Sequence, residues 1–225
     1  PLLTLLNIRL GVWLYWRKTW NRPTMLYLVR ELLSQIDERL PFLNVSDGGH
    51  IENLGLYELL RRKCAFIVVV DSEADEAIAC AGLIKALRLA QVDLNIHVDI
   101  DLDDFRRDEK GNTRTHYQLG VIRYPDGDRG YLLYLKSSLT GDEEHLLSDY
   151  RARHPSFPHQ STAVQFFDEE QFEAYRSLGL HVCDSAIQVA GLEHRGRGDI
   201  EALIDGLRAN LLPDDHEDVS PRQSS

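Results

Sequence analysis

The stretch from Ala65 to Val70 constrains the fold of this chain more than any other. It reads Ala-Phe-Ile-Val-Val-Val, an apolar and mostly β-branched run without polar alternation. Such a run is typical of a strand buried on both faces, as in a parallel sheet covered by helices. A helical pattern follows over 74–91 and a second strand pattern over 94–100. Strand, helix and strand in this order form a βαβ unit, so we predict an α/β fold with a mostly parallel sheet flanked by helices.

A hairpin is predicted further along the chain. Strand patterns over 117–124 and 131–136 flank the turn sequence Pro125-Asp126-Gly127, which predicts an antiparallel hairpin over about 117–136 added to the sheet. The remaining elements are expected as follows: a helix over 24–40 capped by Thr24 and ended by Pro41, a strand over 42–46, a short helix from 53 or 55 to 62, and helices over 142–151, 168–178 and 199–211.

Composition excludes several classes of protein. Of 225 residues, 43% are hydrophobic and 27% are charged, which excludes a wholly disordered chain, a collagen-like repeat and a disulfide scaffold. The net charge of −11 argues against nucleic acid as a partner, because phosphate contacts need clustered Lys and Arg. We find no internal repeat, so residues 1–212 are expected to form one domain or part of one. Residues 213–225 are polar and acidic, and we predict a disordered tail there.

The cysteines and the first residues of the chain give information about the compartment and about contact with membranes. Cys64, Cys80 and Cys183 form no C-x-x-C pair, and we interpret them as buried small residues in a reducing compartment. The apolar run 2–16 is interrupted by polar residues and is too short to span a bilayer. Aromatic and basic residues gather over 13–22. This cluster fits a membrane surface or a core segment with cations at its end, and the sequence favours neither.

The most informative stretch runs from Val45 to Gly55, VSDGGHIENLG. Asp47 follows a predicted strand, and the glycines after it allow a sharp turn. Ligands of open α/β sheets bind beyond the carboxyl ends of strands, so Asp47 is a candidate functional carboxylate. The alternative is a simple turn, since Asp-Gly is a common turn dipeptide. His50 is a candidate by position or a turn-stabilising residue, and Asn53 is expected to cap the following helix.

The run 46–64, SDGGHIENLGLYELLRRKC, resembles the catalytic-aspartate region of bacterial patatin-like phospholipases. Other stretches resemble the same family in the right order. One lies upstream, over 2–11; the others lie downstream, over 134–143, at His154-Pro155 and over 157–162. The similarity covers most of residues 1–180.

The resemblance implies a partial patatin-like three-layer fold and a lipid acyl hydrolase with a Ser–Asp dyad. The family aspartate matches Asp47, which would orient and deprotonate the serine hydroxyl. Gly48, Gly49, His50 and Asn53 would form the supporting turn. The implied substrate is a phospholipid or other acyl ester, with no cofactor and no metal.

One departure from the family pattern is decisive. The nucleophile of the family lies in a Gly-x-Ser-x-Gly elbow, and this sequence contains neither that motif nor a Gly-rich oxyanion loop. Both features precede the aspartate in the family. We therefore expect a C-terminal part of such an enzyme, inactive alone and completed by the N-terminal portion of its own domain. Its sheet should expose an edge and an apolar face. The expected location is the cytoplasmic side, with membrane association through upstream segments.

Three alternatives remain open at this point. The first is a non-catalytic lipid-associated or protein-interaction module on the same scaffold. The second is a metal-dependent transferase, because acidic residues alternate after the second predicted strand at Asp99, Asp101, Asp103 and Asp104; a solvated strand end explains them equally. The third is a hydrolase or metal site over 154–161, where the prolines instead favour a rigid loop whose histidines hydrogen-bond locally.

Overall fold

The computed structural model describes residues 12–15, 25–33, 35, 37, 39–45, 47–161, 166–191 and 200–212. The chain divides into two compact units, Pro1–Asn53 and Leu54–Ser225, and each is described by itself. The predicted cap at Thr24, the segment 2–11 and the tail 213–225 lie outside the described residues.

Among its described residues, the first unit contains a small antiparallel ribbon, an α-helix and a 3-10 turn. Strand β1 (Val12–Tyr15) pairs with β2 (Phe42–Val45), which confirms a strand after Pro41. Phe42 is buried against the rings of Tyr15 and Tyr27, at centroid distances of 4.9 and 4.8 Å. Helix α2 spans only Met25–Leu32, so the predicted helix over 24–40 was too long. Asp37 Oδ1 instead accepts a hydrogen bond from the Arg39 N–H, a local turn that competes with helix.

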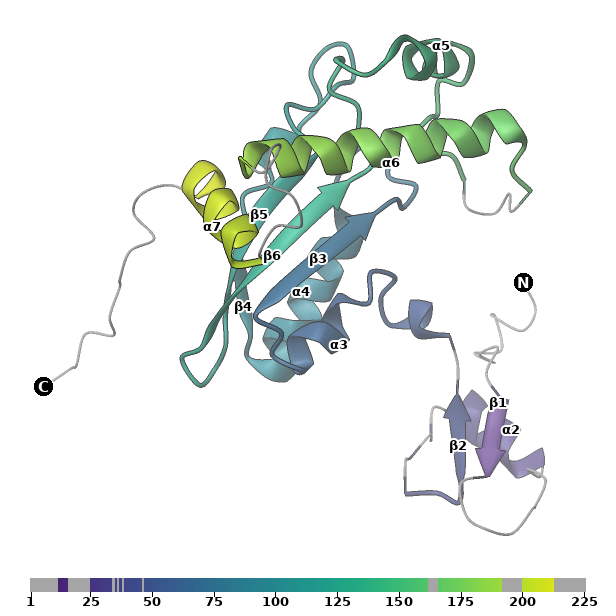
Figure 1. Cartoon of the computed structure of the whole chain (residues 1–225). Coiled ribbons are helices and arrows are strands. Elements are labelled where there is room, and N and C mark those ends of the chain that lie inside the picture. The colour runs from purple at the N-terminus through teal and green to yellow at the C-terminus, as the bar shows by residue number, and fades with distance from the viewer. Residues whose placement is uncertain are drawn as a thin grey trace, which may run out of the picture. The chain divides into compact units, whose positions relative to one another are not determined.

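The second unit is built on a four-stranded sheet in the order β3-β6-β5-β4 (Figure 1). Its strands are β3 (Phe66–Asp71), β4 (His97–Asp99), β5 (Tyr117–Arg123) and β6 (Arg129–Lys136). The pair β3–β6 is parallel, whereas β5 pairs antiparallel with both β6 and β4. The α/β class is confirmed, but a mostly parallel sheet was wrong. The predicted hairpin β5–β6 is present and lies between the two strands of the βαβ unit, at the centre of the sheet.

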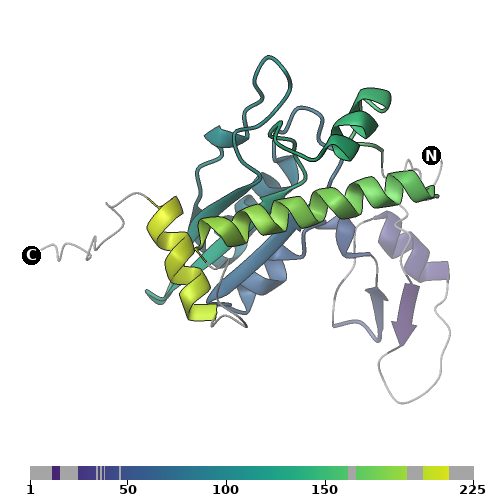
Figure 2. The ribbon, with the colours of Figure 1, turned by 45° about the horizontal axis from the view of Figure 1, so that its top comes forward.

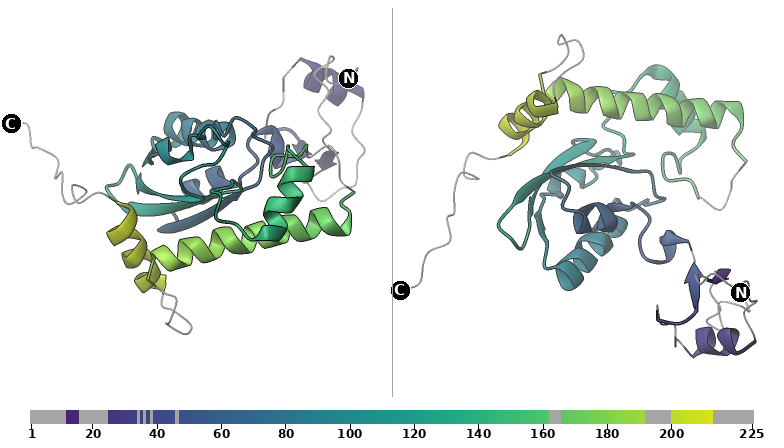
Figure 3. Two further views of the ribbon diagram at one scale, coloured as in Figure 1. Left: turned by 90° about the horizontal axis from the view of Figure 1, so that it is seen from above. Right: turned by 60° about the horizontal axis from the view of Figure 1, so that its bottom comes forward.

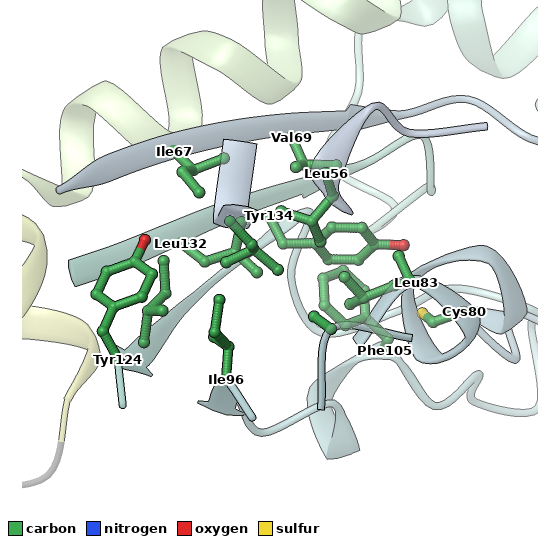
Figure 4. Packing of buried hydrophobic residues seen from close by; sticks show 14 of the residues in the cluster. Leu56, Ile67, Val69, Cys80, Leu83, Ile96, Phe105, Tyr124, Leu132 and Tyr134 are labelled. Carbon is green, nitrogen blue, oxygen red and sulfur yellow. The ribbon is translucent and has the colours of Figure 1, made fainter. Parts of the chain in front are cut away.

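Helices cover both faces of this sheet (Figures 2 and 3). Helices α3 (Leu56–Arg61) and α4 (Ala81–Leu94) pack on one face through Leu56, Leu60 and Leu83. Figure 4 shows this core, in which the Tyr134 and Phe105 rings meet edge to face at 5.6 Å. Helices α6 (Glu169–Val189) and α7 (Ile200–Leu211) build the second core, and α5 (His145–Arg153) packs against α6. The unit therefore has three layers.

Strand β3 lies at the edge of the sheet. Ile67 and Val69 point into the first core, but Val68 and Val70 are 46% and 66% exposed. Burial of this strand on both faces was therefore a wrong prediction. The reason is that α6 and α7 lie mainly over β6 and β5, although Phe66 of β3 packs against the second core. The expected exposed edge with apolar side chains is present among the described residues.

Helix boundaries differ from the sequence patterns where side chains or left-handed residues intervene. The Asp75 carboxylate accepts hydrogen bonds from the Ala79 and Cys80 N–H groups, and Cys80 has a φ of 50°. Helix α4 consequently begins at Ala81 and not at 74. Asn95, with a φ of 53°, ends it and shortens the strand predicted over 94–100 to β4. Helix α6 continues to Val189, beyond the expected end at 178, because its buried stripe extends through Ala186.

Two further expectations concern burial. The three cysteines form no disulfide; Cys80 is buried as predicted, whereas Cys183 is exposed, so its predicted burial was wrong. Helix α6 carries Cys183 on its outer side, away from the second core.

Within the described parts of the chain, every helix falls short of the length and apolar character needed to cross a bilayer.

Candidate active-site residues

Asp47 lies two residues after the end of β2, at the start of a 3-10 turn formed by Gly48–His50. Its side chain is exposed, and Oδ1 accepts a hydrogen bond from the Gly49 N–H at 3.1 Å. The Ile51 N–H closes the turn by donating to the Gly48 carbonyl at 2.8 Å. The strand and the turn together hold the carboxylate at a fixed place on the surface of the first unit.

Gly49 is the tightest position in this turn. A Cβ added there would lie 2.7 Å from Asn53 Oδ1 and 3.6 and 3.7 Å from the two carboxylate oxygens of Asp47. A side chain at this position would therefore require the Asn53 side chain to shift. Asp47, Gly48, Gly49 and Asn53 lie close together, and His50 occupies the last position of the turn.

Asn53 does not cap the following helix. The N-cap of α3 is Gly55, with a φ of 68° and no side-chain cap hydrogen bond. Asn53 lies two residues before this N-cap position. The side chain of Asn53 lies against Gly49 instead, so its structural role is in the Asp47 turn.

A second polar centre lies in the other unit, at the carboxyl ends of the parallel strands β3 and β6. Lys136 Nζ lies 3.1 Å from Asp71 Oδ2, and the Tyr134 hydroxyl donates to the same oxygen at 2.5 Å. Asp75 Oδ2 lies 3.6 Å from the Lys136 ammonium. Burial raises the pKa of Tyr134, and the neighbouring Asp71 charge adds to the rise. The phenol therefore stays protonated and serves as a hydrogen-bond donor.

His159 borders this centre and is buried. Burial lowers its pKa to about 4, and the positive charges of Arg107 and Lys136 act in the same direction. The imidazole is therefore neutral near pH 7. The loop around it contains a cis Phe157–Pro158 bond, and His154 stacks on Tyr150 at 4.3 Å.

A cavity of about 170 Å³ lies near the end of β3. Its walls are mainly apolar, and Ser72 and Gln160 add polar groups. The Ser72 and Ser137 hydroxyls lie 2.7 Å apart, directly after the two parallel strands. Such a cavity can accept a hydrocarbon group beside a few hydrogen-bonding atoms. It is lined by Ser72, Gln160, Ser161, Phe167, Phe172 and Tyr175.

The acidic residues after β4 do not converge. Asp99 pairs with Arg123, Asp103 with Arg106 and Asp104 with Arg114. The Asp101 carboxylate accepts the Asp103 N–H. Each side chain therefore has its own partner, as expected for a solvated strand end. Among the described residues, the side chains that do converge as metal ligands belong to another group, which includes His116 and His181.

The sequence reasoning missed Asp71 and Lys136 as a pair. A signal was present, because each is a charged residue directly after an apolar strand run. Their register opposite each other in β3 and β6 brings them together, and that register depends on the order of the strands.

Comparisons with known proteins add no further assignment. A scan against protein-family models matched no family, and searches of curated proteins and of solved structures returned no match.

Proposed function

We propose that residues 1–212 are the C-terminal portion of a patatin-like phospholipase, a serine acyl ester hydrolase with a Ser–Asp dyad. In this proposal Asp47 orients and deprotonates a serine hydroxyl supplied by the missing N-terminal portion of the same domain. The substrate is a phospholipid or another acyl ester, and no cofactor or metal takes part. The protein works at the cytoplasmic side of a membrane, associated through upstream segments.

The observation that carries this proposal is the Asp47 turn. The carboxylate follows a strand, is exposed, and is oriented by the Gly49 N–H at 3.1 Å. A carboxylate that serves as a base must be held within hydrogen-bond reach of its partner hydroxyl, and a glycine turn leaves room for that partner.

Two features of the second unit support the rest of the proposal. The edge strand β3 exposes Val68 and Val70, as expected for a sheet that another portion of the domain completes. The cavity beside Ser72 has aromatic walls from Phe167 and Phe172, which suit an acyl chain.

Hydrolysis of nitrophenyl butyrate tests the dyad. We expect no hydrolysis by the 225-residue chain. The longer chain encoded with its upstream segment should hydrolyse the ester, and Asp47→Asn should lower its kcat by about 10²–10⁴-fold, the usual contribution of a general base. Asp37→Asn is the matched control, because Asp37 is also an exposed aspartate that accepts the N–H of residue i+2 in the same unit. Asp37→Asn should change kcat by less than about two-fold, which is far less than the loss expected for Asp47→Asn.

Two results would overturn the assignment. One is ester hydrolysis by the 225-residue chain that survives Asp47→Ala. The other is an active longer chain in which Asp47→Asn and Asp37→Asn have the same small effect.

A second candidate function, a non-catalytic lipid-associated module on the same scaffold, is favoured by helix α2. Its apolar residues and the adjoining Leu33 recur at helical spacing and form one exposed stripe: Met25, Leu26, Val29, Leu32 and Leu33. Such a stripe can insert into a lipid surface. Sedimentation with anionic phospholipid vesicles should then be lost in Leu26→Glu and kept in Leu146→Glu, an equally exposed leucine on α5. Equal sedimentation of both variants, or none by the parent chain, removes this candidate.

A further inference from the structure

Two histidines and two carboxylates converge on the side of the sheet covered by α6. His116 directly precedes β5, Asp142 and Glu143 lie between β6 and α5, and His181 lies on α6. We call these four residues the His/carboxylate cluster. One ligand atom from each residue lies within 4.8 Å of the ligand atoms of the other three. Three separate segments of the second unit therefore contribute to one small volume.

Both histidines direct Nε2 at the carboxylates. His181 Nε2 lies 3.3 Å from Asp142 Oδ1, and His116 Nε2 lies 4.0 Å from Glu143 Oε1. The two rings meet edge to face at 5.1 Å. The other nitrogen of the first histidine, His116 Nδ1, lies 3.2 Å from the Ser138 hydroxyl. An outer hydrogen bond of this kind fixes the orientation of metal-binding imidazoles.

The cluster combines two carboxylates with two histidines and is partly buried. The side chains of His116 and Glu143 are 3% and 4% exposed. Among the described residues, the basic groups that pair with Asp142 and Glu143 are the two histidines. Partly buried carboxylates are stabilised when they are paired or coordinate a metal, and two imidazole nitrogens lie beside them here.

The loop that carries the carboxylates is itself held in place. Glu143 Oε1 accepts the Thr140 N–H at 2.5 Å, and Oε2 accepts the Gly141 N–H at 3.0 Å. The Thr140 hydroxyl reaches His116 Nε2 at 3.0 Å and also donates to Asp142. Carboxylate oxygens keep further lone pairs for a metal.

We propose that His116, Asp142, Glu143 and His181 bind one zinc ion. Two imidazoles and two carboxylates form a nitrogen and oxygen set that zinc accepts in tetrahedral geometry, whereas calcium and magnesium prefer oxygen ligands alone. Zinc bonds of about 2.0–2.2 Å require the ligands to move closer together. The exposed Asp142 and the partly exposed His181 can make that movement. The ion would link α6 to the start of β5 and to the loop after β6.

Zinc titration of the chelator-treated 225-residue chain against a chromophoric chelator tests the site. We expect one zinc per chain and a rise in the melting temperature on zinc addition. His181→Ala and Asp142→Ala should each weaken zinc binding by about 10-fold or more, in line with the loss of one ligand or its support. His145→Ala is the matched control, because His145 is an exposed histidine on α5 outside the cluster.

Cobalt(II) in place of zinc gives an independent readout. Tetrahedral cobalt with nitrogen and oxygen ligands should show visible d–d absorption in the parent chain and in His145→Ala, and not in His181→Ala. The proposal is overturned if less than one zinc binds per chain, if calcium displaces zinc, or if His181→Ala binds zinc as tightly as His145→Ala.

Discussion

The Lys136 ammonium lies 3.1 Å from Asp71 Oδ2, and both side chains are only 1% exposed. The two residues face each other as the last pair of the parallel strands β3 and β6. Removal of two charges from water is costly, and their mutual attraction and the Tyr134 hydrogen bond offset that cost. The pair therefore ties the edge strand to the centre of the sheet.

Lys136→Met should lower the free energy of unfolding by about 3–5 kcal/mol, because it leaves the Asp71 carboxylate buried beside Asp75 without its cation. Urea denaturation measures this loss. Lys63→Met, which breaks the exposed ion pair with Asp126, is the control and should cost less than about 1 kcal/mol. Similar losses in the two variants would show that burial does not increase the contribution of the Lys136–Asp71 pair to the free energy of unfolding.

The stability should depend on His159 at mildly acidic pH. Its pKa is about 4 in the folded chain, against about 6.5 for an unfolded histidine. The unfolded state therefore takes up a proton first, so this contribution is complete above pH 6.5 and is lost as the pH falls toward 4. We expect a fall of about 3 kcal/mol in unfolding free energy over this window. His159→Gln should make the unfolding free energy less dependent on pH over this window. An unchanged pH dependence would contradict the assignment of this effect to His159.

Two helical glycines should respond oppositely to alanine. A Cβ at Gly206 on α7 would lie 2.1 Å from the Ala190 carbonyl oxygen, so Gly206→Ala must push α7 away from α6 at a cost of about 1–3 kcal/mol. A Cβ at Gly179 on α6 meets nothing within 4 Å. Gly179→Ala should therefore stabilise the helix by about 0.5–1 kcal/mol. Thermal unfolding should separate the two variants, and shifts of the same sign would refute the α6–α7 contact.

The outer face of β3 should promote self-association. Val70→Lys places a charge on this edge and should reduce light scattering of concentrated protein, since charged edges resist strand pairing. Val92→Lys, at an exposed valine on α4, is the matched control and should have little effect. If both variants reduce scattering equally, then net charge and not the edge explains the change.

Local sequence patterns predicted the elements whose causes are local. The hairpin β5–β6 was predictable because Gly127, with a φ of 93°, completes a turn encoded by three neighbouring residues. The strand before Asp47 and the turn after it were predictable for the same reason. The start of α4 was not, because it depends on the Asp75 carboxylate reaching the Cys80 N–H five residues away.

Pairing between strands far apart in the sequence explains the other differences between the predicted and the observed fold. The apolar run of β3 could not reveal that its strand partner is β6, since 63 residues separate Asp71 from Tyr134. The mixed order of the sheet follows from that pairing, and so does the Asp71–Lys136 contact. The convergence of His116 and His181 likewise requires α6 to lie across the sheet, which no spacing in the sequence encodes.

The strand order also determines when β3 can pair with another strand during synthesis on the ribosome. Strand β3 is translated before the other strands of its sheet. Its only strand neighbour among the described residues, β6, is made about 60 residues later, which takes roughly 3–13 s at ordinary elongation rates. The β5–β6 hairpin then closes within microseconds. The time for which Ile67 to Val70 stays unpaired in the nascent chain is therefore governed by the speed of translation, and slow codons over residues 100–128 would lengthen the period in which chaperones must protect it.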